Sequence, residues 1–137
     1  MALTHLIDTS VLSRLRHQAV REVVEPMAAA GSLARAGISD LEIGFSARSA
    51  QEWDRALDAL SSLDLIETSS DHVRRARQVQ RLLAAKHQRV RKLPDLLIAA
   101  AAEVNSLVVL HYDQDFDRIS AVTGQPVEWI LPAGTVD

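Results

Sequence analysis

The feature that most constrains the fold is the apolar run Leu-Val-Val-Leu at residues 107–110 together with the cluster of carboxylates that follows it. Asp113, Asp115 and Asp117 come directly after this run, in the segment His-Tyr-Asp-Gln-Asp-Phe-Asp at residues 111–117. A short apolar run of this kind is typical of a strand that is buried on both faces. Like charges this close repel one another, so their place at the end of a buried strand requires an explanation.

Short apolar runs alternate with segments of helical periodicity along the chain. Apolar residues that recur every three or four positions predict amphipathic helices, and short runs between turn residues predict strands. We expect strands at residues 3–7, 33–38, 63–68, 106–111 and 127–130. We expect helices at residues 10–18, 22–30, 39–48, 51–60, 71–87, 95–105 and 115–123. This order predicts an α/β fold, with one domain over residues 1–137 and a three-layer α/β/α sandwich around a mostly parallel sheet of four to five strands.

Composition narrows the classes of protein and of site. The 137 residues suffice for one domain with a sizeable core, and the absence of cysteine excludes disulfides and thiolate metal sites. The N-terminal segment lacks the basic and apolar regions of a signal peptide. The longest apolar stretch, near residues 96–102, is far shorter than a membrane span. We therefore expect a cytoplasmic protein that does not enter a membrane.

Acidic residues also stand at or near the other predicted junctions between strands and helices. Each of them has an ordinary structural explanation. Asp8 would cap the first helix, Ser39 and Glu42 would form a capping box, and Asp95 would complement the dipole of a buried helix. In a parallel sheet, however, such junctions meet at the carboxyl ends of the strands, where ligands bind. The acids are therefore expected to converge at one edge of the sheet.

Carboxylates that converge in this way need a cation or a proton. Two unit charges about 4 Å apart repel by about 4 kcal/mol at an effective dielectric constant near 20. Oxygen ligands favour Mg²⁺ or Mn²⁺, whereas zinc is disfavoured because the chain has no cysteine and its five histidines are scattered. Carboxylate-held divalent ions are a known arrangement for the hydrolysis of phosphodiesters.

Four acid-bearing segments carry a family resemblance. They are Leu-Ile-Asp-Thr-Ser-Val-Leu at residues 6–12, Ser-Asp-Leu-Glu at 39–42, Lys-Leu-Pro-Asp-Leu-Leu-Ile-Ala-Ala-Ala-Ala at 92–102, and the segment at 111–117. Together and in this order they resemble the signatures of PIN-domain ribonucleases, and more closely those of the VapC toxins of toxin–antitoxin pairs. The resemblance spans most of the chain.

The resemblance implies a PIN-like fold and a Mg²⁺- or Mn²⁺-dependent endoribonuclease that is the toxin of a type II toxin–antitoxin system. It also implies an RNA substrate, a cognate VapB-type antitoxin and a homodimer. By position, the metal-binding and catalytic acids of the family fall on Asp8, Glu42, Asp95 and Asp113, with Asp115 as a frequent fifth acid. Thr9 and Ser10 match a hydroxyl pair that often orients the first aspartate or a metal-bound water.

Charge is distributed unevenly along the chain. Residues 72–92 hold eight of the fifteen lysines and arginines and no acid, whereas residues 93–137 hold seven acids and one base. A basic rim beside an acidic site would hold RNA phosphates without reading bases, and we expect Arg89, Arg91 and Lys92 to contribute to it. A solvated helix face followed by a basic loop explains the same pattern equally well.

Other classes of protein share parts of this pattern. A receiver-like signalling domain also has an acidic Mg²⁺ pocket, but it needs a lysine after a late strand, and no lysine follows Lys92. A phosphatase of the haloacid dehalogenase type needs Asp-x-Asp after the first strand, where this chain has Asp8-Thr9-Ser10. A non-catalytic module that binds RNA or protein is the remaining alternative.

Overall fold

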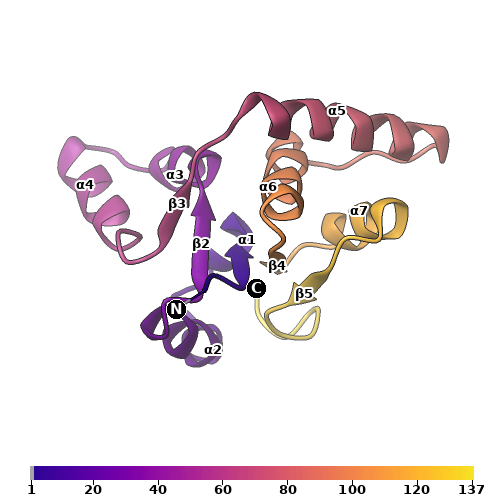
Figure 1. Ribbon diagram of the computed structural model, residues 1–137. Coiled ribbons are helices and arrows are strands. Elements are labelled where there is room, and N and C mark those ends of the chain that lie inside the picture. Colours follow the sequence, from indigo (N-terminus) through magenta and orange to yellow (C-terminus); the bar gives the residue numbers. More distant parts are fainter. Residues whose placement is uncertain (1) are drawn as a thin grey trace.

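The computed structural model describes residues 2–137, and its centre is a five-stranded parallel sheet (Figure 1). The order of the strands in the sheet is β3-β2-β1-β4-β5, and all four neighbouring pairs are parallel. The strands are β1 (His5–Ile7), β2 (Leu33–Ala36), β3 (Asp64–Ile66), β4 (Val108–His111) and β5 (Val127–Trp129). The predicted α/β fold with a parallel sheet is confirmed.

Helices connect the strands and cover both faces of the sheet (Figure 1). They are α1 (Thr9–Leu12), α2 (Gln18–Ala29), α3 (Gly37–Gly44), α4 (Ala50–Asp58), α5 (Ser70–Ala85), α6 (Leu93–Val104) and α7 (Asp115–Thr123). Helix α7 has the predicted bounds, and most other predicted elements lie within a few residues of the observed ones. The first predicted helix is shorter than expected, because α1 makes only one turn before the chain bends toward α2.

Two apolar clusters, one on each face of the sheet, form the core. Leu6 and Ile7 are neighbours on β1, and their side chains belong to different clusters because successive residues of a strand point to opposite faces. Helices α5, α6 and α7 contribute to the cluster that contains Leu6, and α1 and α2 contribute to the cluster that contains Ile7. These are the three layers that the sequence predicts.

The predicted capping box at the start of α3 is wrong. The helix begins at Gly37, two residues earlier than expected, and Ala36 is the N-cap residue. Ser39 therefore lies inside the first turn, where its side chain is fully buried and hydrogen-bonded to Thr9 rather than to a backbone N–H of α3. Glu42 is consequently available for another role.

The register of the sheet brings the predicted strand-end acids to one edge. Ile7 of β1 pairs with Leu110 of β4, and the Asp8 backbone N–H donates to the Leu110 carbonyl at 2.8 Å. Asp8 therefore lies beside the chain segment that leads from β4 to Asp113. Across residues 2–137, no helix has both the length and the apolar character that a membrane crossing requires.

Candidate metal centre

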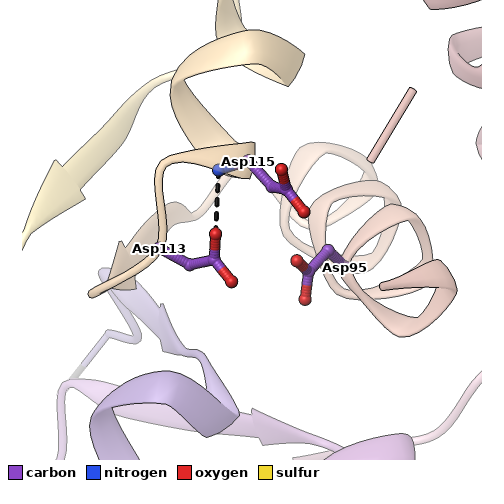
Figure 2. A group of neighbouring side chains, drawn as sticks. All are labelled: Asp95, Asp113 and Asp115. Atoms are coloured by element: carbon purple, nitrogen blue, oxygen red, sulfur yellow. Dashed lines mark hydrogen bonds between the residues drawn. The ribbon is translucent and has the colours of Figure 1, made fainter. Parts of the chain in front are cut away.

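Three buried carboxylates meet at the carboxyl edge of the central strands (Figure 2). Asp95 lies in the first turn of α6, Asp113 follows β4, and Asp115 is the first residue of α7. One oxygen of each lies within 4.8 Å of the others, and the exposed fractions of the three residues are 3%, 7% and 0%. The Asp115 backbone N–H donates to Asp113 Oδ1 at 2.9 Å, which fixes the turn between these two acids.

Asp8, the residue after β1, adjoins this group and is near enough for its charge to raise the pKa of Asp95. Its Oδ2 accepts hydrogen bonds from the Ser10 backbone N–H at 2.9 Å and from the Ser10 hydroxyl at 2.5 Å, so Asp8 is the N-cap of α1 as predicted. The Ser10 hydroxyl oxygen in turn accepts from the Tyr112 backbone N–H at 2.8 Å. Ser10 thereby ties the end of β1 to the segment that carries Asp113.

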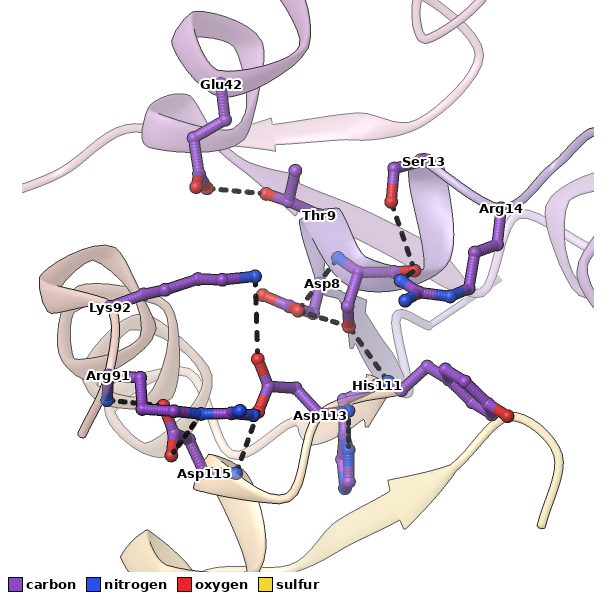
Figure 3. A network of polar contacts seen from close by, with 12 residues as sticks. Asp8, Thr9, Ser13, Arg14, Glu42, Arg91, Lys92, His111, Asp113 and Asp115 are labelled. Atoms are coloured by element: carbon purple, nitrogen blue, oxygen red, sulfur yellow. Dashed lines mark hydrogen bonds and ion pairs between the residues drawn. The ribbon is translucent and has the colours of Figure 1, made fainter. Parts of the chain in front are cut away.

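Glu42 is connected to the group through a hydroxyl. The Thr9 hydroxyl donates to Glu42 Oε1 at 2.7 Å (Figure 3). It is also hydrogen-bonded to Ser39 Oγ at 2.8 Å. Glu42 lies outside the three-carboxylate group, but it is near enough to contribute, by repulsion, to a higher pKa of Asp8. Thr9 therefore orients a fifth carboxylate at the margin of the site.

Three basic side chains face Asp113 and Asp115, and Figure 3 shows two of them, Arg91 and Lys92. Arg118 Nη1 lies 2.6 Å from Asp115 Oδ1, one helical turn away on α7. Arg91 Nη2 lies 3.4 Å from Asp113 Oδ1, and its backbone N–H donates to Asp115 Oδ2 at 2.7 Å. Lys92 Nζ lies 3.7 Å from Asp113 Oδ2. The segment before α6 is thus attached to the acids by backbone and side chain.

Burial and mutual repulsion favour protons on two of the acids. Burial raises the pKa of Asp95 to about 8, with further increases from the charges of Asp8, Asp113 and Asp115. Burial likewise raises the pKa of Asp8 to about 6, against the lowering effect of its hydrogen bonds to Ser10. Asp8 Oδ1 and Asp95 Oδ2 are also buried, and neither has a hydrogen-bond partner among residues 2–137. The charge of Lys92 lowers the pKa of Asp95 only in part, so both acids still favour the protonated form.

This set of donors fits a hard divalent cation. All the atoms offered are carboxylate oxygens, which Mg²⁺ and Mn²⁺ prefer. The neighbouring His111 is fully buried between Phe116 and Trp129, and burial lowers its pKa to about 4. Its Nδ1 accepts the Asp113 backbone N–H at 3.2 Å, so this histidine supports the turn.

Comparison with known proteins identifies the family. The sequence pattern of the PIN domain matches residues 5–122. The chain belongs to the PIN domain family. Two similar PIN proteins are Ribonuclease VapC51 and Ribonuclease VapC21 of Mycobacterium tuberculosis. The first is 63% identical over 137 residues and covers the whole of both chains. The second is 45% identical over 139 residues and covers 98% of this chain and 99% of its own.

A solved structure confirms the PIN fold. It is VapBC2 from Rickettsia felis bound to a DNA fragment from its promoter, with a TM-score of 0.76 and 18% sequence identity. The match covers 94% of this chain and 98% of that one. The high identity to the two VapC proteins places this chain among PIN domains of the VapC type.

The PIN fold brings most of the predicted site residues together. Asp95, Asp113 and Asp115 form the compact group, and Asp8 adjoins it. Arg91 and Lys92 form ion pairs with Asp113 and Asp115. Arg89 is exposed, and none of the ion pairs found among residues 2–137 joins it to the site.

Sequence reasoning missed two residues of this PIN domain. Arg118 forms an ion pair with Asp115. Ser39 is hydrogen-bonded to the Thr9 hydroxyl, which also contacts Glu42. The three-residue spacing of Asp115 and Arg118 on a predicted helix was a usable signal for the first. No sequence signal identified the second, because the capping-box pattern assigned Ser39 to a different hydrogen bond.

Proposed function

We propose that this protein is a metal-dependent endoribonuclease that hydrolyses RNA phosphodiester bonds, and that it is the toxin of a VapBC-type pair. One observation carries the proposal: three buried carboxylates converge at the carboxyl edge of a PIN sheet beside Asp8, and one oxygen each of Asp8 and Asp95 has no hydrogen-bond partner in the described chain. The names of its relatives, Ribonuclease VapC51 and Ribonuclease VapC21, support the activity.

Mg²⁺ or Mn²⁺ is the proposed cofactor. The proposed ligands, direct or through water, are Asp8, Glu42, Asp95, Asp113 and Asp115. When bound, such an ion activates a water molecule and stabilises the negative charge that develops on the phosphodiester oxygens.

The side chains of this protein prepare the site for that chemistry. Asp95 and Asp8, whose pKa values are raised, release their protons when a cation takes the place of the proton. Ser10 and Thr9 hold Asp8 and Glu42 in fixed orientations through their hydroxyl groups. Arg91 has an exposed side chain and lies beside Asp113, so it is placed to hold a phosphate of the RNA.

The proposed partners follow from the same family. Structures similar to this chain include the VapBC complexes from Rickettsia felis and Salmonella typhimurium. We propose a VapB-type antitoxin that binds this toxin, a homodimer of the toxin, and action in the cytoplasm. Arg89 and Lys92 are proposed, with Arg91, to contact the RNA.

The deciding experiment is cleavage of total cellular RNA by the purified, antitoxin-free protein. Mg²⁺, Mn²⁺ and a chelator are compared, beside Asp95→Asn and the control Asp64→Asn. Asp64 is exposed and is the first residue of β3, whereas the site lies at the carboxyl ends of β1 and β4. Its substitution therefore removes the same charge without touching the site.

We expect discrete RNA fragments that require the metal, persist in Asp64→Asn and fall by at least about 100-fold in Asp95→Asn. The fragment ends would identify the substrate. Cleavage that survives in chelator, or in Asp95→Asn, would contradict the proposal. Absence of cleavage by folded protein on every RNA class would favour a binding role instead.

A further inference from the structure

A hollow beside the carboxylates lies outside the metal centre. Its volume is about 580 Å³, and its wall is formed by the start of α7, the end of β5 and the segment that follows β5. The residues that line it are Gln114, Asp117, Trp129, Ile130, Leu131, Pro132 and Ala133. A second hollow of about 460 Å³ shares Gln114, Trp129 and Ala133 with the first and continues to Asp113. The two hollows therefore form one depression that runs from Asp113 toward the edge strand β5.

Trp129 is held rigidly at the junction of the two hollows. Its ring packs against His111, with 4.9 Å between the ring centroids, and against the edge of Tyr112 at 5.4 Å. Its Nε1–H lies 3.2 Å from both carboxylate oxygens of Asp117. The indole is only partly buried, so an apolar ring that is fixed in orientation borders the depression. Nucleobases stack on aromatic side chains presented in this way.

The polar groups around Trp129 can recognise the edge of a base. Asp117 and Gln114 are exposed and line the first hollow beside the indole. A carboxylate only accepts hydrogen bonds and has more acceptor positions than the Trp129 N–H uses, whereas the Gln114 amide both donates and accepts. Guanine alone among the four RNA bases offers two adjacent donors, N1–H and the N2 amino group, which match the two oxygens of a carboxylate.

The second hollow supplies charge for a phosphate. Arg14, Arg91 and Lys92 line it together with Asp113. The Arg14 guanidinium is fixed in place: it donates to the Ser10 carbonyl at 2.8 Å and to the Asp137 carbonyl at 2.9 Å, and it lies 4.8 Å from the centre of the Tyr112 ring. A base on Trp129 would thus have its phosphate directed toward these cations and the carboxylates.

We propose that the depression between Trp129, Asp117, Gln114 and Arg14 is a guanine-binding subsite for an RNA nucleotide next to the bond that is cut. Trp129 stacks on the base, and Asp117 accepts from N1–H and N2. The subsite rests on the proposed ribonuclease function, and it assigns a role to Asp117, the third acid of the segment at residues 111–117.

The test is nucleotide binding without metal, so that no RNA is cut. The indole N–H signals of the ¹⁵N-labelled protein are followed by NMR in chelator, and the Trp129 signal is assigned with Trp129→Phe. The probes are GMP, AMP, CMP, UMP, ribose 5-phosphate, and two tetranucleotides, one of uridines only and one with a guanosine at its second position. We expect GMP and the guanosine tetranucleotide to shift the Trp129 signal and to bind about tenfold more tightly than their counterparts without guanine.

Two substitutions separate base recognition from general attraction. Asp117→Asn should remove most of the preference for guanine, while the control Glu128→Gln should keep it. Glu128 neighbours Trp129 on β5 but points to the other face, where it contacts His5. Equal shifts by GMP and ribose 5-phosphate, an unchanged preference in Asp117→Asn, or binding of free GMP but not of the guanosine tetranucleotide would each overturn the subsite. Because cleavage is measured separately, failure of the subsite leaves the ribonuclease assignment standing, and the reverse also holds.

Discussion

The two halves of the acidic cluster differ in whether the protein itself balances their negative charge. On the side of β1, Asp8 and Glu42 are held by hydroxyl groups, and no arginine or lysine of the described chain forms an ion pair with either. On the side of β4, the carboxylates are paired with cations, and the pairs involve Asp113, Asp115, Arg91, Lys92 and Arg118. Asp95 lies beside the second half but has no ion pair of its own among residues 2–137.

This difference shows what each kind of partner does for a buried acid. A hydroxyl group orients a carboxylate but brings no positive charge, so burial still favours the protonated form, and the pKa of Asp8 rises to about 6. Arginine and lysine bring the opposite charge and fix the position of the carboxylate at the same time. The first half is therefore open to a cation, whereas the second half is already compensated by the protein.

The largest effect on stability is expected when the compensated half loses its most buried ion pair. Arg118→Ala leaves Asp115, which is fully buried, without the arginine at 2.6 Å, and it should lower the free energy of unfolding by about 3 kcal/mol. Urea denaturation in chelator measures this change. Arg74→Ala is the matched control, because Arg74 pairs with Asp71 at the same spacing and distance on α5, but both side chains are exposed.

The control should cost less than about 1 kcal/mol, because solvent screens exposed ion pairs. If the two alanine variants lost stability equally, burial would not distinguish the two pairs. The account of the compensated half would then be wrong.

The uncompensated acids should make the metal-free protein sensitive to pH. The pKa of Asp95 is about 8 in the folded state and near 3.8 in an unfolded chain, so the folded state binds the extra proton between these values. Its contribution to stability is complete below about pH 4 and is lost as the pH rises through 8. Asp95→Asn carries no such charge, and in chelator at pH 8 it should be more stable than the parent protein by about 1–3 kcal/mol.

Thermal unfolding at pH 5 and pH 8.5 in chelator checks this prediction, with Asp64→Asn as the control. The advantage of Asp95→Asn should grow with pH, and the control should follow the parent protein. An advantage that stays constant with pH would show that repulsion at Asp95 is not its cause. With Mg²⁺ or Mn²⁺ present, the order should reverse if Asp95 binds the ion, because only the parent protein gains stability from it.

Much of the fold was predictable because it depends on local patterns. The bounds of α7 follow from its helical periodicity, and the buried character of α6 follows from its run of apolar residues. The convergence of Asp8 and Asp113 also followed from sequence, because each comes directly after a short apolar strand. Parallel pairing then places both residues at the same edge.

Contacts between distant segments were not predictable in the same way. Ser39 matched the local rule for a capping box, but the fold places Thr9 against it, so tertiary structure decided which hydrogen bond it makes. Likewise, Arg91 and Arg89 are alike in sequence, yet only Arg91 donates a backbone N–H to Asp115 and approaches Asp113. Spacing along the chain carries no information on which of two nearby arginines turns toward a site formed by other segments.

The smallest effect on stability is expected for Arg91→Ala. This substitution separates the role of the Arg91 side chain from that of its backbone N–H. The side chain is 69% exposed and lies 3.4–3.8 Å from the acids, so Arg91→Ala should change the free energy of unfolding by less than about 1 kcal/mol. The backbone N–H to Asp115 remains in the variant and keeps the segment in place. RNA binding in chelator should nevertheless weaken, and the slope of its logarithmic salt dependence should fall by about one unit, as for the loss of one phosphate contact. Arg89→Ala is the control, because Arg89 lies two residues away and, within the described chain, forms no ion pair with the acids. An equal loss of RNA affinity in both variants would indicate general attraction by the basic segment. A larger loss for Arg91→Ala would place the phosphate beside Asp113.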